Sequence, residues 1–200
     1  MSHSGRTARE YLLRRGVDPE TIEKFYLGYA PDDWRQLEEH LLKKGFPIEA
    51  ITESGLVRRS QRSDLYIDFL RNRIIFPIHD LGGRVIGFGG RLISGDGPKY
   101  LNSAENRIFS KRFHLFGLYH GREAIRSAAE VILVEGYMDC LALHQYGIGN
   151  VVATLGTAFT REQAKLIKRY TETVLVMYDG DEAGQRETLR ALEVLHQEGI

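Results

Sequence analysis

The sequence predicts an α/β protein in which an α+β part, residues 1–123, is followed by a parallel α/β sheet in residues 124–200. Two observations lead to this prediction. Glycine interrupts the apolar runs between Leu56 and Leu118, which is typical of short antiparallel strands and hairpins. After about residue 124, apolar strands and helical segments alternate three times, which favours a parallel sheet covered by helices.

Helix signals dominate the first fifty residues, and a hairpin signal follows them. Helices are expected at residues 7–15, from Asp18-Pro19 onward, from Asp32 or Asp33 to Lys44, and from Pro47 to about Gly55. The apolar segments 73–79 and 84–91 flank Leu81-Gly-Gly83, so we expect them to pair as a β-hairpin. These elements form the predicted α+β part.

The sequence of residues 124–200 predicts three strands and three helices. The strands are expected at 131–134, 150–155 and 174–178, and the helices at 139–146, 160–170 and 181–198. Thr160 and Gln163 fit a capping box at the start of the second of these helices. A parallel sheet of three strands is small, so we expect that it is truncated at its C-terminus and that a further strand has been removed.

Composition excludes several classes of protein. The hydrophobic fraction of 42% and the charged fraction of 27% are ordinary for a soluble globular protein. The apolar runs are far shorter than the roughly 20 residues that a membrane-spanning helix needs. The single cysteine, Cys140, excludes an intramolecular disulfide and a cysteine-based zinc site within this chain. A reducing cytoplasm is therefore the expected location.

Charge is distributed unevenly although the formal net charge is zero. Residues 1–125 contain 20 Lys and Arg against 16 Asp and Glu, whereas residues 126–200 contain 7 against 11. Residues 56–112 are the most basic stretch, with 11 basic and 5 acidic side chains. A basic segment beside an acidic one suits a protein that binds phosphates next to metal ions, although scattered surface charge explains the counts equally well.

Three carboxylates directly follow the apolar strands. Glu135 follows residues 131–134, and Asp179 and Asp181 follow residues 174–178. Ligands of open parallel sheets bind at the carboxyl ends of the strands, so we expect these side chains to meet there. Converging carboxylates repel each other unless they bind a cation, and oxygen ligands favour Mg²⁺ or Mn²⁺ over zinc. In the alternative interpretation, Asp179 and Asp181 form a turn and Asp181 only caps the following helix.

These residues resemble a known family. Glu135-Gly-Tyr-Met-Asp139 together with Asp179-Gly-Asp181 resembles the toprim signature. Three upstream motifs are similar to those of bacterial DnaG-type DNA primases: Arg71-Asn-Arg-Ile-Ile-Phe-Pro-Ile78, Gly83-Arg-Val-Ile-Gly-Phe-Gly-Gly-Arg91 and Pro98-Lys-Tyr-Leu-Asn-Ser103. The resemblance covers essentially the whole chain, and the last motif is the most specific. The second part of the chain is accordingly expected to be a toprim domain.

The resemblance implies an RNA polymerase core that makes short primers from ribonucleoside triphosphates on single-stranded DNA. Glu135 then matches the catalytic glutamate, Asp179 and Asp181 match the metal-binding pair, and Asp139 is a supporting metal ligand. Glu135 acting as a general base and Glu135 acting as a metal ligand remain equally good alternatives. The residues that match positions near the nucleotide, the template or the RNA–DNA hybrid are Arg15, Arg73, Arg91, Lys99, Tyr100, Asn102 and Lys111.

Two parts of a complete primase are not found in the sequence. The resemblance implies a zinc-binding N-terminal module and a C-terminal domain that binds the replicative helicase at the replication fork. Since neither is present, we expect this chain to be weakly active or inactive alone. Another toprim enzyme (a topoisomerase or nuclease) and a non-catalytic nucleic-acid-binding module are the competing interpretations.

Overall fold

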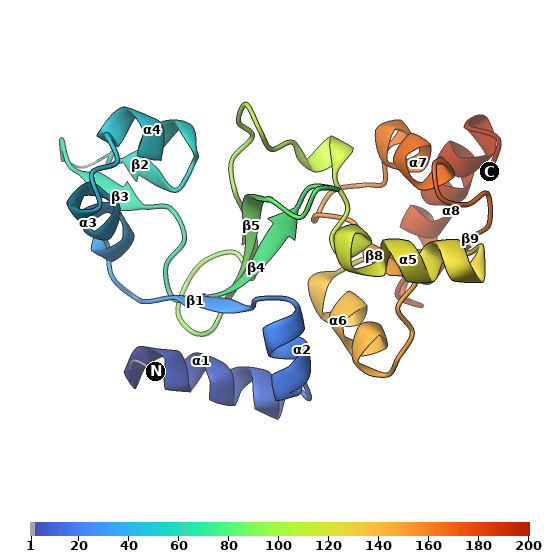
Figure 1. Ribbon diagram of the computed structural model, residues 1–200, viewed down its shortest axis with the longest axis horizontal. Coiled ribbons are helices and arrows are strands. Elements are labelled where there is room, and N and C mark those ends of the chain that lie inside the picture. Colours follow the sequence, from blue (N-terminus) through green and yellow to red (C-terminus); the bar gives the residue numbers. More distant parts are fainter. Residues whose placement is uncertain (1–2, 62) are drawn as a thin grey trace.

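The computed structural model describes residues 3–61 and 63–200, and it confirms the predicted α/β class. Figure 1 shows the elements up to β6 at the left and centre, and the elements from α5 onward at the right. In chain order the elements are α1 (His3–Arg14), α2 (Pro19–Lys24), β1 (Gly28–Ala30), α3 (Gln36–Lys43), α4 (Ile48–Glu53), β2 (Val57–Arg59), β3 (Tyr66–Asp68), β4 (Arg73–His79), β5 (Val85–Leu92), β6 (Tyr100–Asn102), the 3₁₀ turn η1 (Lys111–Phe113), α5 (Leu118–Ala128), β7 (Val131–Val134), α6 (Tyr137–Gln145), β8 (Val151–Ala153), α7 (Arg161–Lys168), β9 (Val174–Val176) and α8 (Glu182–Gln197).

The strands of the described residues form three sheets. An antiparallel sheet has the order β1-β4-β5-β6, strands β2 and β3 form a separate pair, and a parallel sheet has the order β8-β7-β9. The predicted hairpin is β4–β5, and the predicted alternation of strands and helices runs from β7 to α8. Helix α5 crosses the boundary that we placed between residues 123 and 124, so the two parts share a continuous helix. The domain division itself stays a prediction.

Helix α3 is capped by a residue far away in the sequence. We expected Asp32 or Asp33 to cap it, and that expectation is wrong. The carboxylate of Asp68, which ends β3, accepts hydrogen bonds from the backbone N–H groups of Leu37 at 2.7 Å and Glu38 at 2.9 Å. These are donors that a helix leaves unsatisfied in its first turn. A carboxylate brought from another strand replaces the local cap.

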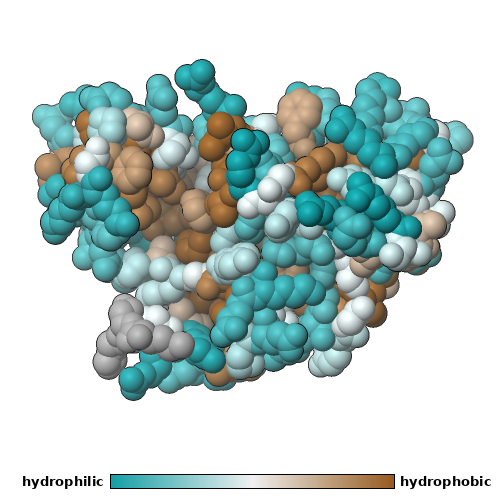
Figure 2. Space-filling model, in the orientation of Figure 1, coloured by the Kyte–Doolittle hydropathy of each residue, from teal (hydrophilic) through white to brown (hydrophobic). Residues whose placement is uncertain are grey.

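The lobe formed by α3, α4, β2 and β3 leaves an apolar recess against the antiparallel sheet. A pocket of about 710 Å³ lies there, with Leu56, Ile75 and Phe88 among its lining residues. Figure 2 shows this recess as a group of hydrophobic residues between the lobe and the central strands. None of the predicted catalytic carboxylates lines it, so it is separate from the acidic strand ends.

Tyr137, the first residue of α6, joins the parallel sheet to the antiparallel one. Its ring stacks on Phe76 of β4 with 4.7 Å between the ring centroids, and its hydroxyl donates to Asn102 Oδ1 at 2.6 Å. The Asn102 amide in turn donates to the backbone carbonyl of Leu155, just after β8. A Cβ atom at Gly89 of β5 would come within 2.5 Å of the Tyr137 hydroxyl oxygen. Gly89 therefore provides the space that the tyrosine ring fills.

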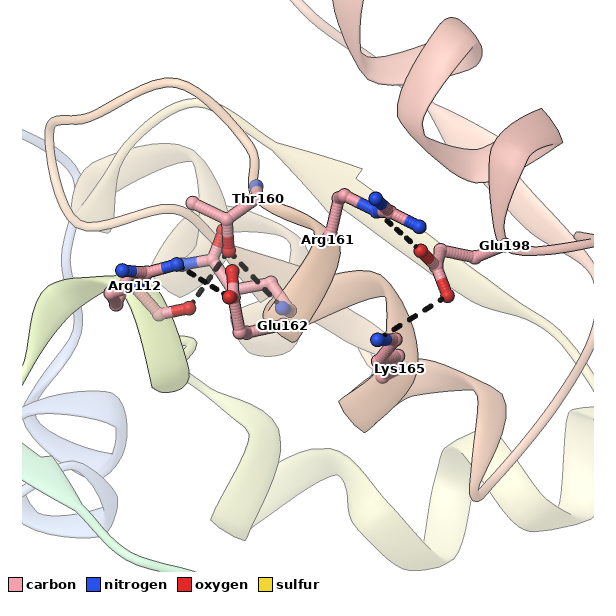
Figure 3. Close-up of polar contacts among 7 residues, drawn as sticks. Arg112, Thr160, Arg161, Glu162, Lys165 and Glu198 are labelled. Atoms are coloured by element: carbon pink, nitrogen blue, oxygen red, sulfur yellow. Dashed lines mark hydrogen bonds and ion pairs between the residues drawn. The ribbon is translucent and has the colours of Figure 1, made fainter.

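Helix α7 is tied to both of its neighbours, as Figure 3 shows. On one side, Arg112 in η1 forms an ion pair with Glu162 at 2.5 Å, and the Thr160 hydroxyl donates to the Arg112 carbonyl at 2.8 Å. On the other side, Arg161 pairs with Glu198 at 2.6 Å, just after α8. The predicted capping box of Thr160 at this helix is confirmed. These contacts join η1, α7 and α8 into one unit.

Substituting Gly89 by alanine tests the packing of Tyr137. The added methyl group overlaps the tyrosine ring, so we expect G89A to destabilise the protein by about 1–3 kcal/mol. Gly28 of β1 is the matched control, because a Cβ atom there meets only Ile75 Cβ at an ordinary 3.6 Å. Urea unfolding measures both variants. Equal stability of G89A and G28A would contradict the close packing.

A cluster of one buried and two half-buried histidines, His144, His79 and His120, lies near α2, α5 and α6. The His120 ring lies 4.4 Å from Phe25 and 5.1 Å from His79, centroid to centroid. His144 Nε2 lies 3.0 Å from the Val151 carbonyl oxygen, whereas His144 Nδ1 and His120 Nε2 have no hydrogen-bond partner among the described residues. Burial, followed by the nearby His79 and His144, lowers the pKa of His120 from 6.5 to about 4. Burial also lowers the pKa of His79 and of His144.

This cluster predicts a loss of stability in mild acid. Because the folded protein keeps His120 neutral, the unfolded chain binds more protons below the ordinary pKa of 6.5. Stability should fall as the pH drops from 6.5 toward 4, with contributions from His120, His79 and His144. We expect His120→Leu to make this slope shallower in urea unfolding measured at several pH values. A wild-type stability that does not change over this range contradicts the prediction.

Candidate functional site

The carboxylate of Glu135, which follows β7, contacts the backbone that follows β9. Glu135 Oε1 accepts a hydrogen bond from the backbone N–H of Asp179 at 3.1 Å, although the two residues are 44 positions apart. Gly184, in the first turn of α8, packs directly against both residues. A Cβ atom at this position would lie 3.0 Å from Glu135 Oε1 and would overlap the Asp179 carbonyl oxygen. Asp181 caps α8, since its Oδ1 accepts from the Gly184 N–H at 2.8 Å. The strand ends thus lie in contact and Asp181 acts as a helix cap, as in the alternative interpretation, while the convergence of the three carboxylates on one cation stays a prediction.

Asp139, in the first turn of α6, belongs to the same acidic surface. Burial raises the pKa of Asp139, the negative charge of Asp179 raises it further, and the positive charge of Arg91 offsets part of the rise. Asp139 therefore lies within electrostatic range of an acidic neighbour from β9 and of a cation from β5. Tyr178 also lies near these negative charges. Burial is the largest cause of its raised pKa, and the charges of Glu135 and Glu187 raise the pKa further.

The donor chemistry fits a hard divalent cation, but the geometry does not form a closed cage. Within the described residues, no group of three or more His, Cys, Asp or Glu side chains is arranged to hold a metal ion. Asp181 uses one carboxylate oxygen as a helix cap. Mg²⁺ often binds through one or two carboxylates while it keeps waters and binds substrate phosphates. Glu135, Asp179 and Asp139 offer only oxygen ligands, so they fit an open site of this kind.

Cations and aromatic rings alternate beside this surface, from α1 across β5 to β6. Arg91 is 6% exposed and donates to the hydroxyls of Tyr11 at 2.7 Å and Tyr100 at 2.5 Å. The Arg15 guanidinium lies 5.7 Å from the centroid of the Tyr11 ring, and Lys99 Nζ lies 5.9 Å from that of Tyr100. Arg15 and Lys99 are exposed at the two ends. We call these five residues the cation–aromatic ladder.

Two of the residues predicted to bind nucleotide or template have structural contacts instead of open side chains. Arg73 is 5% exposed and donates to the backbone carbonyls of Gly90 at 3.1 Å and Pro98 at 3.0 Å. It thereby fixes the loop that leads to Lys99. The side-chain amide of Asn102 is held between Tyr137 and the backbone after β8. Their contact with nucleotide or template stays a prediction.

Lys111 lies apart from the ladder in its contacts. Its backbone N–H donates to Glu105 Oε1 at 3.0 Å, and its carbonyl accepts from Gln163 Nε2 at 2.9 Å. Gln163 is fully buried, and it also donates to the His114 carbonyl at 2.8 Å. The backbone of Lys111 is therefore held by α7. Among the described residues, no contact joins Lys111 to Arg91 or Lys99.

Sequence reasoning missed Tyr11 as a member of the site. Its spacing from Arg15 is four residues, which places the two side chains on one face of a helix. That spacing was the available signal. The link from Tyr11 to Arg91 had no such signal, because the two residues are 80 positions apart.

Comparison with known proteins gives a consistent result over the whole chain. A family model described as "DNA primase catalytic core, N-terminal domain" matches residues 1–122, and one described as "Toprim-like" matches residues 132–200. A DNA primase of Clostridium acetobutylicum is 48% identical over 199 residues, which cover 98% of this chain and 33% of the relative. One of Halalkalibacterium halodurans is 44% identical and covers 100% and 33%. The chain thus spans about a third of the length of these curated relatives.

Solved structures agree with this result. The zinc-binding and RNA polymerase domains of the Aquifex aeolicus primase have a TM-score of 0.90 and 44% identity, over 98% of this chain and 48% of that one. A DnaG primase catalytic domain bound to single-stranded DNA has a TM-score of 0.88 and 40% identity, over 97% and 60%.

Gly184 offers a direct test of the acidic site. A methyl group there overlaps backbone atoms of Asp179, which cannot move aside as the end of a flexible side chain could. We expect G184A to shift the Asp179 loop away from Glu135 and to weaken Mn²⁺ binding by roughly tenfold or more. Gly180 is the matched control, because a Cβ atom there meets nothing within 4 Å. Calorimetric Mn²⁺ titrations compare the two variants, and equal affinities would show that the loop position does not matter.

Proposed function

Because the chain belongs to the bacterial DNA primase catalytic-core family, we propose that it carries the nucleotidyl-transfer site of an enzyme that makes RNA primers on single-stranded DNA. The observation that carries the proposal is the contact of Glu135 with Asp179 beside Asp139, within electrostatic range of Arg91. Carboxylates for a cation and guanidinium groups for phosphates are the two needs of phosphoryl transfer. The activity of this chain by itself is part of the proposal.

The acidic residues would hold one or more divalent cations. Glu135, Asp179 and Asp139 are the candidate ligands, and Asp181 would contribute its carboxylate from the start of α8. Mg²⁺ or Mn²⁺, when bound, would supply Lewis-acid activation of the 3′-hydroxyl and neutralise the leaving pyrophosphate. These carboxylates would also orient the incoming ribonucleoside triphosphate through the cation that they share.

The cation–aromatic ladder would bind the template or the RNA–DNA hybrid. Arg15 and Lys99 are exposed, so they would contact phosphates directly, whereas Arg91 would act from its buried position between two phenols. Tyrosine rings between cations are suited to stacking against nucleobases. The similar catalytic domain solved with single-stranded DNA supports this assignment.

Further partners follow from the family alone. A replicative helicase, bound through a C-terminal domain, and a zinc-binding module are proposed for the complete protein. None of the helices in the described residues combines the length and apolar character that a membrane span requires. We place the protein at the replication fork in the bacterial cytoplasm as part of this proposal.

Replacing Asp181 by asparagine tests the metal-binding role and keeps the helix cap, because asparagine caps helices as well as aspartate does. We expect D181N and Asp179→Asn to weaken Mn²⁺-dependent binding of a ribonucleoside triphosphate by about tenfold or more. Affinity for single-stranded DNA should stay equal or rise, because each change removes a negative charge. Titration calorimetry measures the nucleotide, and fluorescence anisotropy measures the DNA.

The same proteins are then assayed for RNA synthesis on a single-stranded template with Mn²⁺. We expect weak synthesis by the unmodified chain and none by Asp179→Asn. Nucleotide binding that is independent of Mn²⁺ contradicts the proposal, and unchanged binding in both variants favours a non-catalytic module. Cleavage of supercoiled DNA by the unmodified chain would favour a topoisomerase or nuclease.

A further inference from the structure

The side chain of Gln145 connects the toprim part to the first helix pair at a point outside the predicted site. Gln145 is the last residue of α6. Its Oε1 accepts from the Asp18 N–H at 2.8 Å, and its Nε2 donates to the Gly16 carbonyl at 2.8 Å. Both partners are backbone groups of the turn between α1 and α2. One amide therefore fixes both sides of this turn.

The turn that Gln145 holds carries Arg15. Helix α1 ends at Arg14, and the Arg15 N–H bonds to the carbonyls of Tyr11 at 3.1 Å and Leu12 at 3.0 Å. The next residue, Gly16, has a φ of 82°, so the chain reverses there. Arg15 is exposed, so burial does not fix its side chain; the turn sets its backbone position, and the guanidinium then lies 5.7 Å from the centroid of the Tyr11 ring.

Helix α6 carries the acidic motif at its other end. Asp139 lies in its first turn, and Tyr137 at its start is locked to Asn102 of β6. Six residues separate Asp139 from Gln145, which corresponds to roughly 9 Å along a helix. A rigid helix of this length transmits the position of the acidic end to the turn that bears Arg15.

We propose that Gln145 is a positioning residue that holds Arg15 at a set distance from the acidic motif, so that Arg15 binds a template phosphate. The role rests on the proposed function, because it has a purpose only if Arg15 contacts nucleic acid. The clamp uses a neutral amide, so it leaves the arginine charge free for the phosphate. Gln145 itself touches no substrate.

Two measurements on Gln145→Ala test the proposal. Without the amide, exchange of the Asp18 N–H with solvent, followed by NMR, should accelerate by roughly tenfold or more. Affinity for a single-stranded oligonucleotide should fall roughly fivefold, and the slope of log affinity against log salt should decrease by about 0.7, the value for one lost phosphate contact on a single strand. Gln197→Ala, the same change at an exposed residue at the end of α8, should alter neither.

A double-mutant cycle with Arg15→Ala separates positioning from a general effect on stability. If Gln145 acts through Arg15, the double variant binds DNA as weakly as Arg15→Ala alone. Additive losses, an unchanged salt slope, or an unchanged Asp18 exchange rate in Gln145→Ala each overturn the proposal. A different result would contradict the proposed function itself: the unmodified chain does not bind DNA, although Asp18 exchange is faster in Gln145→Ala. Gln145 would then hold the turn without positioning Arg15 for nucleic acid, and the positioning role would be overturned as well.

Discussion

The hydrogen bond from Tyr137 to Asn102 determines how the acidic strand ends face the antiparallel sheet. Tyr137 lies between Glu135 and Asp139 in the chain, so its anchoring holds the backbone that carries both carboxylates. The ring is 3% exposed, it stacks on Phe76, and it fills the space above Gly89. A buried hydroxyl without a partner is costly, and the Asn102 amide satisfies it while bonding onward to the toprim part. Packing and hydrogen bonding thus fix one relative position of the two parts.

Neutral amides recur where the basic part meets the acidic part. Asn102, Gln145 and Gln163 each bridge the two parts; Asn102 and Gln145 do so with both the oxygen and the nitrogen, whereas Gln163 does so with its nitrogen alone. An ion pair in their place would neutralise a charge that a metal ion or a phosphate needs. The ion pair of Arg112 with Glu162 does cross the same interface, but its arginine is 59% exposed and stands away from the ladder. The amides therefore join a basic part to an acidic part without neutralising the charged side chains of either part.

Local sequence patterns predicted the elements well, and long-range contacts account for what they missed. The hairpin of β4 and β5 and the capping box of α7 depend on residues a few positions apart, and both are confirmed. The cap of α3 comes from Asp68, some thirty residues away, so the nearby aspartates gave the wrong prediction. The meeting of Glu135 with Asp179 was predictable despite its separation, because parallel strands align their carboxyl ends.

The burial of Arg73 illustrates the limit for single side chains. The family resemblance indicated a contact of Arg73 with nucleotide or template, which stays a prediction, and in the structure backbone carbonyls of a loop accept its hydrogen bonds. No pattern in the sequence distinguishes an arginine that binds carbonyls from one that binds phosphate, because both need the same donors. Only the path of the loop after β5 decides between them.

Arg91 shows why neutral partners matter for the site as a whole. A buried guanidinium usually needs a carboxylate partner, because leaving water is costly for a charge. Here its hydrogen bonds go to two phenols; burial raises the pKa of Tyr100, and the charge of Arg91 offsets part of that rise. No ion pair of Arg91 is found among the described residues, and its positive charge offsets part of the repulsion that Asp179 exerts on Asp139. A lysine at this position would offer three donors on a flexible stem and would lose the proton more readily when buried, so it would not serve equally well. The energetic cost of burying Arg91 thus favours an electrostatic role between the ladder and the acidic surface over a contribution to stability alone.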